Sequence, residues 1–425
     1  MAFKLIKHRF SKSNETIVTG LDIGSSKVCC AIARIESSGD LTVLGYGYQG
    51  SKGLRGGMII DMEALQDAVA HAVHGAEEMA GETIEEVYVS ISPALCQSKS
   101  VRVDLSISAH PVDDDDIKKI IQQAVASVQK TQAVVIHNIP LNYDIDGVGG
   151  IRDPRGMFGE LLKAKLHLML CPRTPLRNLS ACVERSHLDV SGFVSSVYAS
   201  GMATLVDDEL DLGVTLIDMG AGSSSIGLFF NGKLAHVDYV PLGGSHVTSD
   251  IARCFSTPLI QAERLKTLHG SALLSPLDGR ESVVVPQIGD EASAKGLQVT
   301  KAELTEVIRP RVEEILDQLK AKIEQNPAHK YVGKRLVLTG GASLLSGVPE
   351  IAGLILDKQT RLARPLHISG LGENARRSDF VTCAGLLTYG QRQRGPYAMR
   401  AARREASASG TSRFGKVGGW FKENF

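Results

Sequence analysis

One short pattern occurs twice in the sequence: an apolar segment that ends in Asp, a turn of glycine and serine, and another apolar segment. The first copy is LDIGSSK at 21–27, and the second is LIDMGAGSSS at 216–225. A further turn and apolar segment follow each copy, so we predict strands at 17–23, 28–35 and 41–48, and again at 214–218, 225–230 and 233–240. The repetition predicts two related halves rather than a solenoid of short repeats.

The residue types in both turns suit phosphate chemistry. Gly24 and Gly220 allow the backbone to approach a ligand closely, successive N–H groups can form an anion-binding nest, and serine hydroxyls add donors. One Asp-x-Gly turn is weak evidence, because most such turns are simple β-turns. Two copies at corresponding places in two halves are stronger evidence. We therefore predict that the turns bind a polyphosphate between them, and that Asp22 and Asp218 hold a hydrated Mg²⁺.

A third glycine element, LTGGAS at 338–343, follows a predicted strand at 334–339 and precedes a predicted helix near 345–356. Because its glycines lack side chains, a flat nucleoside could lie against this backbone. None of the three elements matches the G-x-G-x-x-G or G-x-x-x-x-G-K-[ST] pattern in the required context, which argues against the Rossmann and P-loop classes.

Composition excludes several classes of protein. The 47 basic and 47 acidic residues give no bulk charge of the kind that nucleic-acid binders carry. The seven cysteines are scattered without a C-x-x-C spacing, which argues against a disulfide framework or a zinc site and predicts a reducing cytoplasm. The start lacks the apolar region of a secretory signal, and no apolar run reaches the ~18 residues of a transmembrane helix. Any membrane contact is therefore expected to be peripheral.

The segment 84–165 is predicted to be an inserted α+β subdomain. Apolar runs at 87–91, 101–107 and 133–139 predict strands, and apolar residues at helical spacing between 117 and 128 predict a helix. An acidic run at 113–116 precedes that helix. We interpret it as a helix start, where carboxylates interact favourably with the helix dipole, rather than as a metal cluster.

After Gln391 the composition changes. The stretch 392–412 is rich in Gly, Ser, Ala and Arg and is predicted to be a flexible linker. The last segment, 413–425, has an apolar stripe on a helical wheel with lysines beside it, which predicts an amphipathic helix on an anionic membrane surface. The residues expected to contact the membrane are Phe414, Val417, Trp420, Phe421, Lys422 and Phe425. A helix docked on the body of the protein is the alternative.

The ordered set of motifs resembles the actin/Hsp70/sugar-kinase superfamily. It consists of the two Asp turns, PLGG at 241–244 and TGGA at 339–342. Within that superfamily the chain resembles the FtsA family of bacterial cell division proteins over essentially its whole length. The distinctive segments are IRDPRGM at 151–157, CVER at 182–185, GGSHVT at 243–248 and GWFKENF at 419–425.

This resemblance implies an α/β, actin-like two-lobed ATPase fold with RNase H-like halves, in which subdomain 1B is replaced by a 1C subdomain of SHS2 type. The implied boundaries are 1–83 and 166–208 for subdomain 1A, 84–165 for 1C, and 209–244 for the first part of 2A. Subdomain 2B would be 245–335, and 336–391 would complete 2A and return to 1A. The linker and the membrane helix would follow at 392–412 and 413–425.

The resemblance also implies a binding site for ATP with Mg²⁺. Asp22 and Asp218 would serve the metal, while Glu263 and Lys266 would contact the ribose and base. The other residues expected to bind the nucleotide are Gly24, Ser25, Ser26, Lys27, Gly220, Gly222, Ser223, Ser224, Gly243, Gly244, Gly340, Gly341 and Ala342.

The function implied by the resemblance is that of a polymerising scaffold in septum formation. Such a protein would lie peripherally on the inner face of the cytoplasmic membrane, bind anionic lipids through its last helix, and tether the Z-ring protein FtsZ. Subdomain 2B would receive the C-terminal peptide of FtsZ, and 1C would recruit later divisome proteins. No nucleic acid is expected among the partners.

One segment departs from the superfamily pattern. Hydrolases of this superfamily carry an acidic or amide residue after the strand near 193–197 to orient water, and SSVYASG at 195–201 contains none. We therefore expect at most slow ATP hydrolysis, with the nucleotide acting mainly as an assembly ligand.

The alternatives to this function are a soluble pilus-type adaptor and a sugar or metabolite kinase of the same superfamily. A kinase would need an aspartate base near 193–205, and the sequence has none there. An Hsp70-type chaperone would need a further substrate-binding domain.

Overall fold

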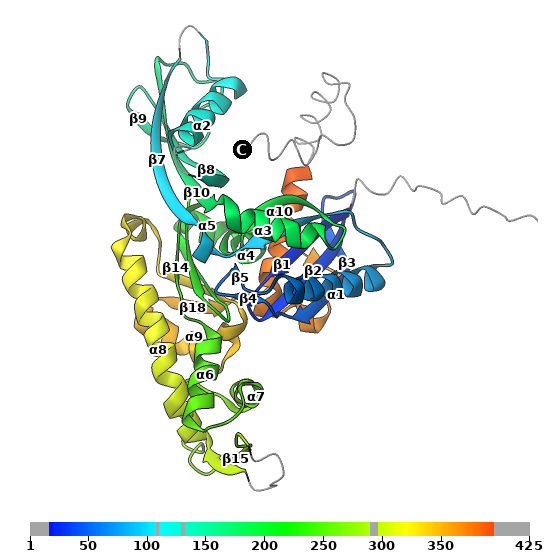
Figure 1. Ribbon diagram of the computed structural model, residues 1–425. Coiled ribbons are helices and arrows are strands. Elements are labelled where there is room, and N and C mark those ends of the chain that lie inside the picture. Colours follow the sequence, from blue (N-terminus) through cyan, green and yellow to red (C-terminus); the bar gives the residue numbers. More distant parts are fainter. Residues whose placement is uncertain (1–16, 108–109, 129–131, 290–295, 367, 395–425) are drawn as a thin grey trace, which may run out of the picture.

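A computed structural model describes residues 17–107, 110–128, 132–289, 296–366 and 368–394 (Figure 1). Its first lobe is built on a sheet with the strand order β11-β6-β1-β2-β3-β19. The strands are β1 (Ile17–Ile23), β2 (Lys27–Ile35), β3 (Leu41–Gly50), β6 (Glu86–Ile91), β11 (Asp189–Ser195) and β19 (Ile368–Ser369). β1, β2 and β3 pair antiparallel, whereas β6 pairs parallel to both β1 and β11.

The second lobe repeats this topology. Its sheet has the order β14-β13-β12-β17-β18, formed by β12 (Val214–Met219), β13 (Ser224–Phe230), β14 (Lys233–Val240), β17 (Arg335–Thr339) and β18 (Gln359–Leu362). Again the first three strands along the chain form an antiparallel meander, and the next two pair parallel beside the first. Two related halves, as the repeated pattern predicts, are therefore present.

Helices cover both faces of the first sheet. On one side, α1 (Met62–Ala80) packs on β2 and β3, and α3 (Arg173–Glu184) contacts α1 and β11. On the other, α10 (Val381–Arg394) packs on β1, β2 and α4 (Ser196–Thr204). Alternate residues of β2 enter different cores: Val28, Cys30 and Ile32 pack on the α1 side, and Cys29 and Ala31 pack on the α10 side. This explains why the strand is apolar throughout rather than alternating.

The second sheet packs against a long helix. The helix α8 (Lys301–Gln325) presents buried apolar residues at helical spacing and begins with a capping box between Thr300 and Glu303. Around it lie α6 (Gly244–Cys254), α9 (Val348–Leu356) and the hairpin of β15 (Ser282–Val285) and β16 (Leu297–Thr300). α7 (Leu259–His269) packs on α6 and β15. The lobes also contain a short helix, α5 (Asp207–Leu212), and the paired strands β4 (Leu54–Arg55) and β5 (Met58–Ile59).

An insert projects from the end of the molecule opposite α7 and β15 (Figure 1). Its sheet has the order β7-β10-β8-β9, formed by β7 (Gln97–Ser106), β8 (Ala133–Ile145), β9 (Val148–Ile151) and β10 (Leu161–Pro172). The helix α2 (Asp114–Val128) packs on three of these strands and encloses a separate apolar core. The insert therefore folds around its own core, as an inserted subdomain requires.

The boundaries expected for the insert, 84–165, are wrong at both ends. β6 lies inside the first-lobe sheet, where it pairs with β1 and β11, so the insert begins after Ile91. At the other end β10 stays paired with β7 as far as Leu170 and with β8 as far as Pro172. A short apolar run such as 87–91 does not show which sheet it joins, because that pairing is formed with strands distant in the sequence.

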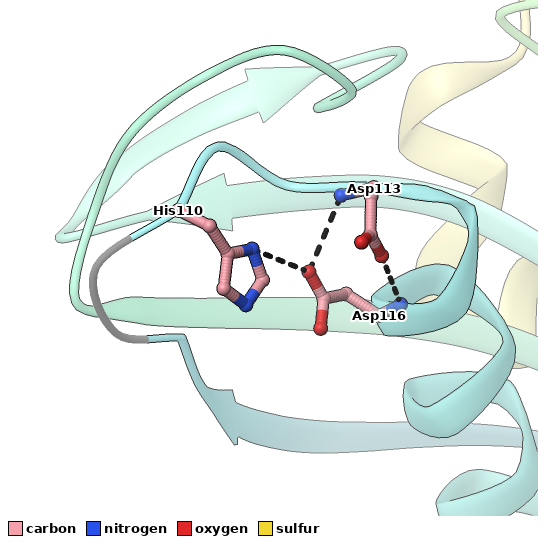
Figure 2. A group of neighbouring side chains, drawn as sticks. All are labelled: His110, Asp113 and Asp116. Atoms are coloured by element: carbon pink, nitrogen blue, oxygen red, sulfur yellow. Dashed lines mark hydrogen bonds and ion pairs between the residues drawn. The ribbon is translucent and has the colours of Figure 1, made fainter.

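The acidic run at the start of α2 caps the helix (Figure 2). The carboxylate of Asp113 accepts hydrogen bonds from the backbone N–H groups of Asp115 and Asp116, both at 2.9 Å. In return, the Asp116 carboxylate accepts one from the N–H of Asp113 at 3.2 Å, and His110 lies 3.6 Å from it. The interpretation as a helix start is therefore confirmed.

Within the described ranges, no helix combines the length and apolar content needed to cross a bilayer. The composition predicts a linker that begins at 392, but α10 continues to Arg394, so the first three residues of the predicted linker are helical. The rest of the predicted linker and the predicted membrane helix at 413–425 lie outside the described residues.

Candidate functional site

Both Asp turns open onto one cleft between the lobes, with a volume of ≈ 1010 Å³. This volume is enough for a ligand the size of a nucleotide. The third glycine element and the helices α6 and α7 complete its wall. The predicted site residues that line the cleft are Asp22, Gly24, Ser25, Ser26, Lys27, Asp218, Gly220, Gly222, Ser223, Gly244, Glu263, Lys266, Gly340, Gly341 and Ala342.

The two turns have the same internal geometry. In the first, the N–H of Gly24 donates to the carbonyl of Lys27 at 3.0 Å, and in the second the N–H of Gly220 donates to that of Ser223 at 3.0 Å. In each turn, a Cβ added to the glycine would lie 2.9 Å from the carbonyl oxygen that accepts its hydrogen bond, so both positions require glycine. The turns also meet, because a Cβ on Gly222 would lie 3.0 Å from the Ser25 hydroxyl. The two halves thus present matched backbone loops to one space.

Asp22 and Asp218 are half-buried at the cleft wall, and their carboxylates interact electrostatically. Burial raises the pKa of Asp22, against the lowering effects of a hydrogen bond from Ser90 and of the Lys27 charge. Burial, followed by the charge of Asp22, raises the pKa of Asp218 to about 7. Two carboxylates that disfavour each other's ionisation provide a site for a cation, which would stabilise both charges.

Hydroxyl groups from other elements hold these two carboxylates. The Ser90 hydroxyl, at the end of β6, donates to Asp22 Oδ1 at 2.7 Å and accepts from the N–H of Ile23 at 3.0 Å. Asp218 is hydrogen-bonded by Ser200 on α4 and Thr382 on α10, whose hydroxyls lie 3.0 Å apart. These three residues form no pattern in the sequence with the turns, because only the folded chain brings them together.

The third glycine element contacts the second turn directly. Gly340 has φ 83°, and a Cβ there would lie 2.5 Å from Asp218 Oδ1 and 2.4 Å from the carbonyl of Met219. Glycine is therefore required both by the backbone conformation and by the close approach.

Lys266 and Glu263 join α7 to α6 at the edge of the cleft. The Lys266 ammonium donates to the carbonyl of Gly244 at 3.1 Å, to the Thr248 hydroxyl at 2.9 Å and to the Glu263 carboxylate at 2.6 Å. The Lys266 side chain is 11% exposed, and that of Glu263 is 50% exposed. Glu263 is thus the member of the pair that is more open to a ligand.

Two predicted site residues do not line the cleft. Ser224 is fully buried, and its hydroxyl donates to the carbonyl of Leu242 at 2.9 Å. Gly243 packs against the second turn, where an added Cβ would lie 2.4 Å from the carbonyl of Gly220. Both support the shape of the turn instead of facing a ligand, which corrects the expected direct contact.

The residues present fit a magnesium polyphosphate. Mg²⁺ binds through one or two carboxylates together with phosphate oxygens and waters, and Asp22 and Asp218 supply such carboxylates at the cleft wall. The glycine and serine turns supply the N–H and hydroxyl donors that phosphate oxygens accept. The segment expected to lack a base, 195–201, lies where β11 passes into α4, and its Ser196 reaches the cleft wall.

Family models match two parts of the chain. The model for "Cell division protein FtsA" matches residues 215–385, and that for "SHS2 domain inserted in FTSA" matches residues 94–170. The second range agrees with the insert that begins after Ile91. Among curated relatives, the cell division protein FtsA of Rhizobium meliloti is 40% identical over 419 residues, covering 96% of this chain and 95% of the relative. That of Escherichia coli is 33% identical over 386 residues, covering 89% and 91%.

Solved structures share the fold at low sequence identity. A structure of the PilM–PilN type IV pilus biogenesis complex matches with a TM-score of 0.66 at 16% identity, covering 88% of this chain and 98% of that one. MreB5 of Spiroplasma citri bound to ADP matches with a TM-score of 0.54 at 14% identity, covering 90% and 98%. The actin-like fold with an SHS2-type insert is thereby confirmed. On the evidence of the family models and the curated relatives, the chain belongs to the FtsA family of cell division proteins.

Proposed function

We propose that the cleft binds ATP with Mg²⁺, and that the nucleotide controls a scaffold used in cell division. The observation that carries this proposal is the pair of matched turns, each beside a half-buried aspartate and both lining one cleft. A role in division follows from the family, and MreB5, which has the same fold, has been solved bound to ADP.

Each group of cleft residues would bind a different part of the magnesium nucleotide. N–H groups and hydroxyls of 24–27 and 220–223 would bind phosphate oxygens, and Gly340 to Ala342 would lie against the nucleoside. Glu263, held by Lys266, would accept a hydrogen bond from the ribose or base. Bound Mg²⁺ would neutralise Asp22, Asp218 and the phosphates together.

We propose at most slow hydrolysis. The acidic residues in the described cleft wall are Asp22, Asp218, Glu263 and Asp379. Two of these are the proposed metal carboxylates, and Glu263 and Asp379 are each paired with a lysine. The segment 195–201 adds no general base, so ATP would serve mainly to favour one conformation for assembly.

The remaining parts would connect the scaffold to its partners. We propose that 413–425 binds anionic lipid on the inner face of the cytoplasmic membrane, and that polymerisation adds avidity to a weak single tail.

The region 245–335, as subdomain 2B, would receive the C-terminal peptide of FtsZ. A groove of ≈ 290 Å³ between α7 and β15, where Leu268 and Val284 lie near Arg264, supports peptide binding there. The insert, as subdomain 1C, would recruit later divisome proteins.

Sedimentation with anionic vesicles tests this function. The intact chain is compared with one that ends at Ser412, each with and without Mg-ATP, and FtsZ is then added. The proposal expects the intact chain alone to pellet, more strongly with Mg-ATP, and to carry FtsZ with it. If both chains stay in solution under every condition, the tail does not bind membranes, and the soluble adaptor or kinase alternatives are favoured.

A further inference from the structure

Lys27 is clamped at the wall of the cleft. Its ammonium lies 2.8 Å from Asp379 Oδ2 and 3.4 Å from the centroid of the Phe380 ring. A carboxylate and an aromatic face both attract a cation, so together they restrict a side chain that otherwise has four rotatable bonds. The Lys27 side chain keeps 22% of its surface exposed and lines the cleft, so the clamped cation stays accessible to a ligand.

The two carboxylate oxygens of Asp379 have different surroundings. Its Oδ2 pairs with Lys27, but its buried Oδ1 has no hydrogen bond among the described residues. The Nε of Arg377, which also lines the cleft, lies 3.6 Å from Oδ1. Asp379 therefore lies between two cations that both face the same space.

The backbone around Asp379 is fixed to the second lobe. The carbonyl of Ser378 accepts hydrogen bonds from the Thr339 hydroxyl at 3.0 Å and from the N–H of Gly340 at 3.2 Å. The Ser378 hydroxyl donates to the carbonyl of Ala363 at 2.7 Å. Asp379 thus ties Lys27, in the first lobe, to a rigid point beside the third glycine element.

We propose that Asp379 is a positioning residue for the nucleotide, holding the Lys27 ammonium where the phosphates of a nucleoside triphosphate bind. The proposal rests on the proposed nucleotide site and adds a residue that acts through Lys27 rather than by touching the ligand. Because the clamp orders Lys27 before the ligand arrives, less conformational entropy is lost on binding.

Two physical effects of Asp379 oppose each other, which makes the proposal testable. As a negative charge at the cleft, Asp379 repels phosphate, so removing the charge by itself strengthens binding. As the clamp of Lys27, it favours phosphate binding, so removing it weakens binding. We infer that the clamp dominates, because Lys27 has a fixed partner at 2.8 Å and a ring beneath it.

The test is a double-mutant cycle on the full chain, with Mg-ATP affinity measured by calorimetry for Asp379→Asn, Lys27→Met and the double variant. Asp379→Asn is expected to weaken binding about 10-fold when Lys27 is present and to leave it unweakened in the Lys27→Met background. Asp379→Glu, which keeps the carboxylate, should recover part of the loss. Asp357→Asn is the matched control, because that carboxylate is 83% exposed and pairs with Lys334 at the surface.

Each other outcome has a definite meaning. Equal or tighter binding by Asp379→Asn overturns the proposal, because the carboxylate then only repels phosphate. An equal loss in the Lys27→Met background also overturns it, because Asp379 would then act independently of Lys27. If the unaltered chain binds no nucleotide, the proposed function fails first and this inference fails with it. Thermal unfolding of each variant without ligand identifies any loss caused by misfolding, and Asp379→Glu then decides the question.

Discussion

The hydroxyl of Ser90 donates a 2.7 Å hydrogen bond to Asp22 Oδ1 and fixes the orientation of that carboxylate toward the cleft. The same hydroxyl accepts from the N–H of Ile23, so it joins β6 to the end of β1. A small residue outside the repeated motif thus orients a proposed metal carboxylate.

Replacement of Ser90 by alanine should therefore weaken Mg-ATP binding. We expect the affinity to fall about 5-fold to 10-fold and the free energy of unfolding to fall by about 1 kcal/mol, the usual contribution of one such hydrogen bond. Calorimetric titration and urea unfolding measure the two effects. Ser191→Ala is the control, since its exposed hydroxyl donates to Glu86 on the same sheet, away from the cleft. Unchanged binding by Ser90→Ala would show that Asp22 needs no such support.

Replacement of Gly340 by alanine should damage both stability and the site. The added Cβ would meet Asp218 Oδ1 at 2.5 Å in a backbone with φ 83°. We expect a loss of at least about 2 kcal/mol in the free energy of unfolding, together with loss of nucleotide binding. Gly232→Ala separates the causes, because Gly232 has φ 76° but no atom within 4 Å of an added Cβ. If the two variants lose equal stability, backbone strain alone explains the effect.

The connection between α6 and α7 should depend on Lys266. Its ammonium is nearly enclosed and satisfies three acceptors, so Lys266→Ala leaves the Gly244 carbonyl and the Glu263 carboxylate without that donor. We expect a loss of about 2 to 3 kcal/mol in the free energy of unfolding. Lys334→Ala breaks an exposed pair with Asp357 and should cost less than about 1 kcal/mol. Denaturant unfolding compares the two, and equal losses would contradict the structural role given to Lys266.

Two buried histidines predict that acid destabilises the fold. Burial, followed by the neighbouring charge of His167, lowers the pKa of His137 to about 3. Burial also lowers the pKa of His167 to about 4, with a backbone hydrogen bond to Leu234 opposing it and the charge of His236 adding to it. The neutral His137 ring accepts a hydrogen bond from the N–H of Ser195 at 3.0 Å, which a protonated nitrogen could not do.

The sign of the pH effect follows from these pKa values. Above the ordinary histidine pKa of 6.5, both groups are neutral in the folded and unfolded states and leave stability unchanged. Below it, the unfolded chain binds protons that the folded chain does not, so each histidine lowers the free energy of unfolding by about 2 kcal/mol at about pH 5. Urea unfolding across this range measures the slope. His137→Gln should remove about half of it, whereas His74→Gln, exposed on α1, should leave it unchanged.

Sequence reasoning predicted the parts of this molecule that are local in the chain. The repeated turns, the strands beside them and the cap of α2 depend on neighbouring residues, and the structure has them where they were expected. The assignment of β6 failed because its short, mostly apolar run suits either sheet, and only pairing with β1 decides between them. Ser90, Thr382 and Asp379 were missed for a related reason: a single hydroxyl or carboxylate carries no pattern until folding brings it to the cleft.

The most direct test of the central claim is calorimetric titration of the full chain with ATP, in Mg²⁺ and after chelation of the metal, alongside Asp218→Asn. The account predicts binding of one ATP per chain in Mg²⁺, and a loss of at least about 10-fold in affinity either without the metal or in the variant. Absence of binding in Mg²⁺, or binding that neither chelation nor Asp218→Asn weakens, would contradict a magnesium nucleotide site between the two halves.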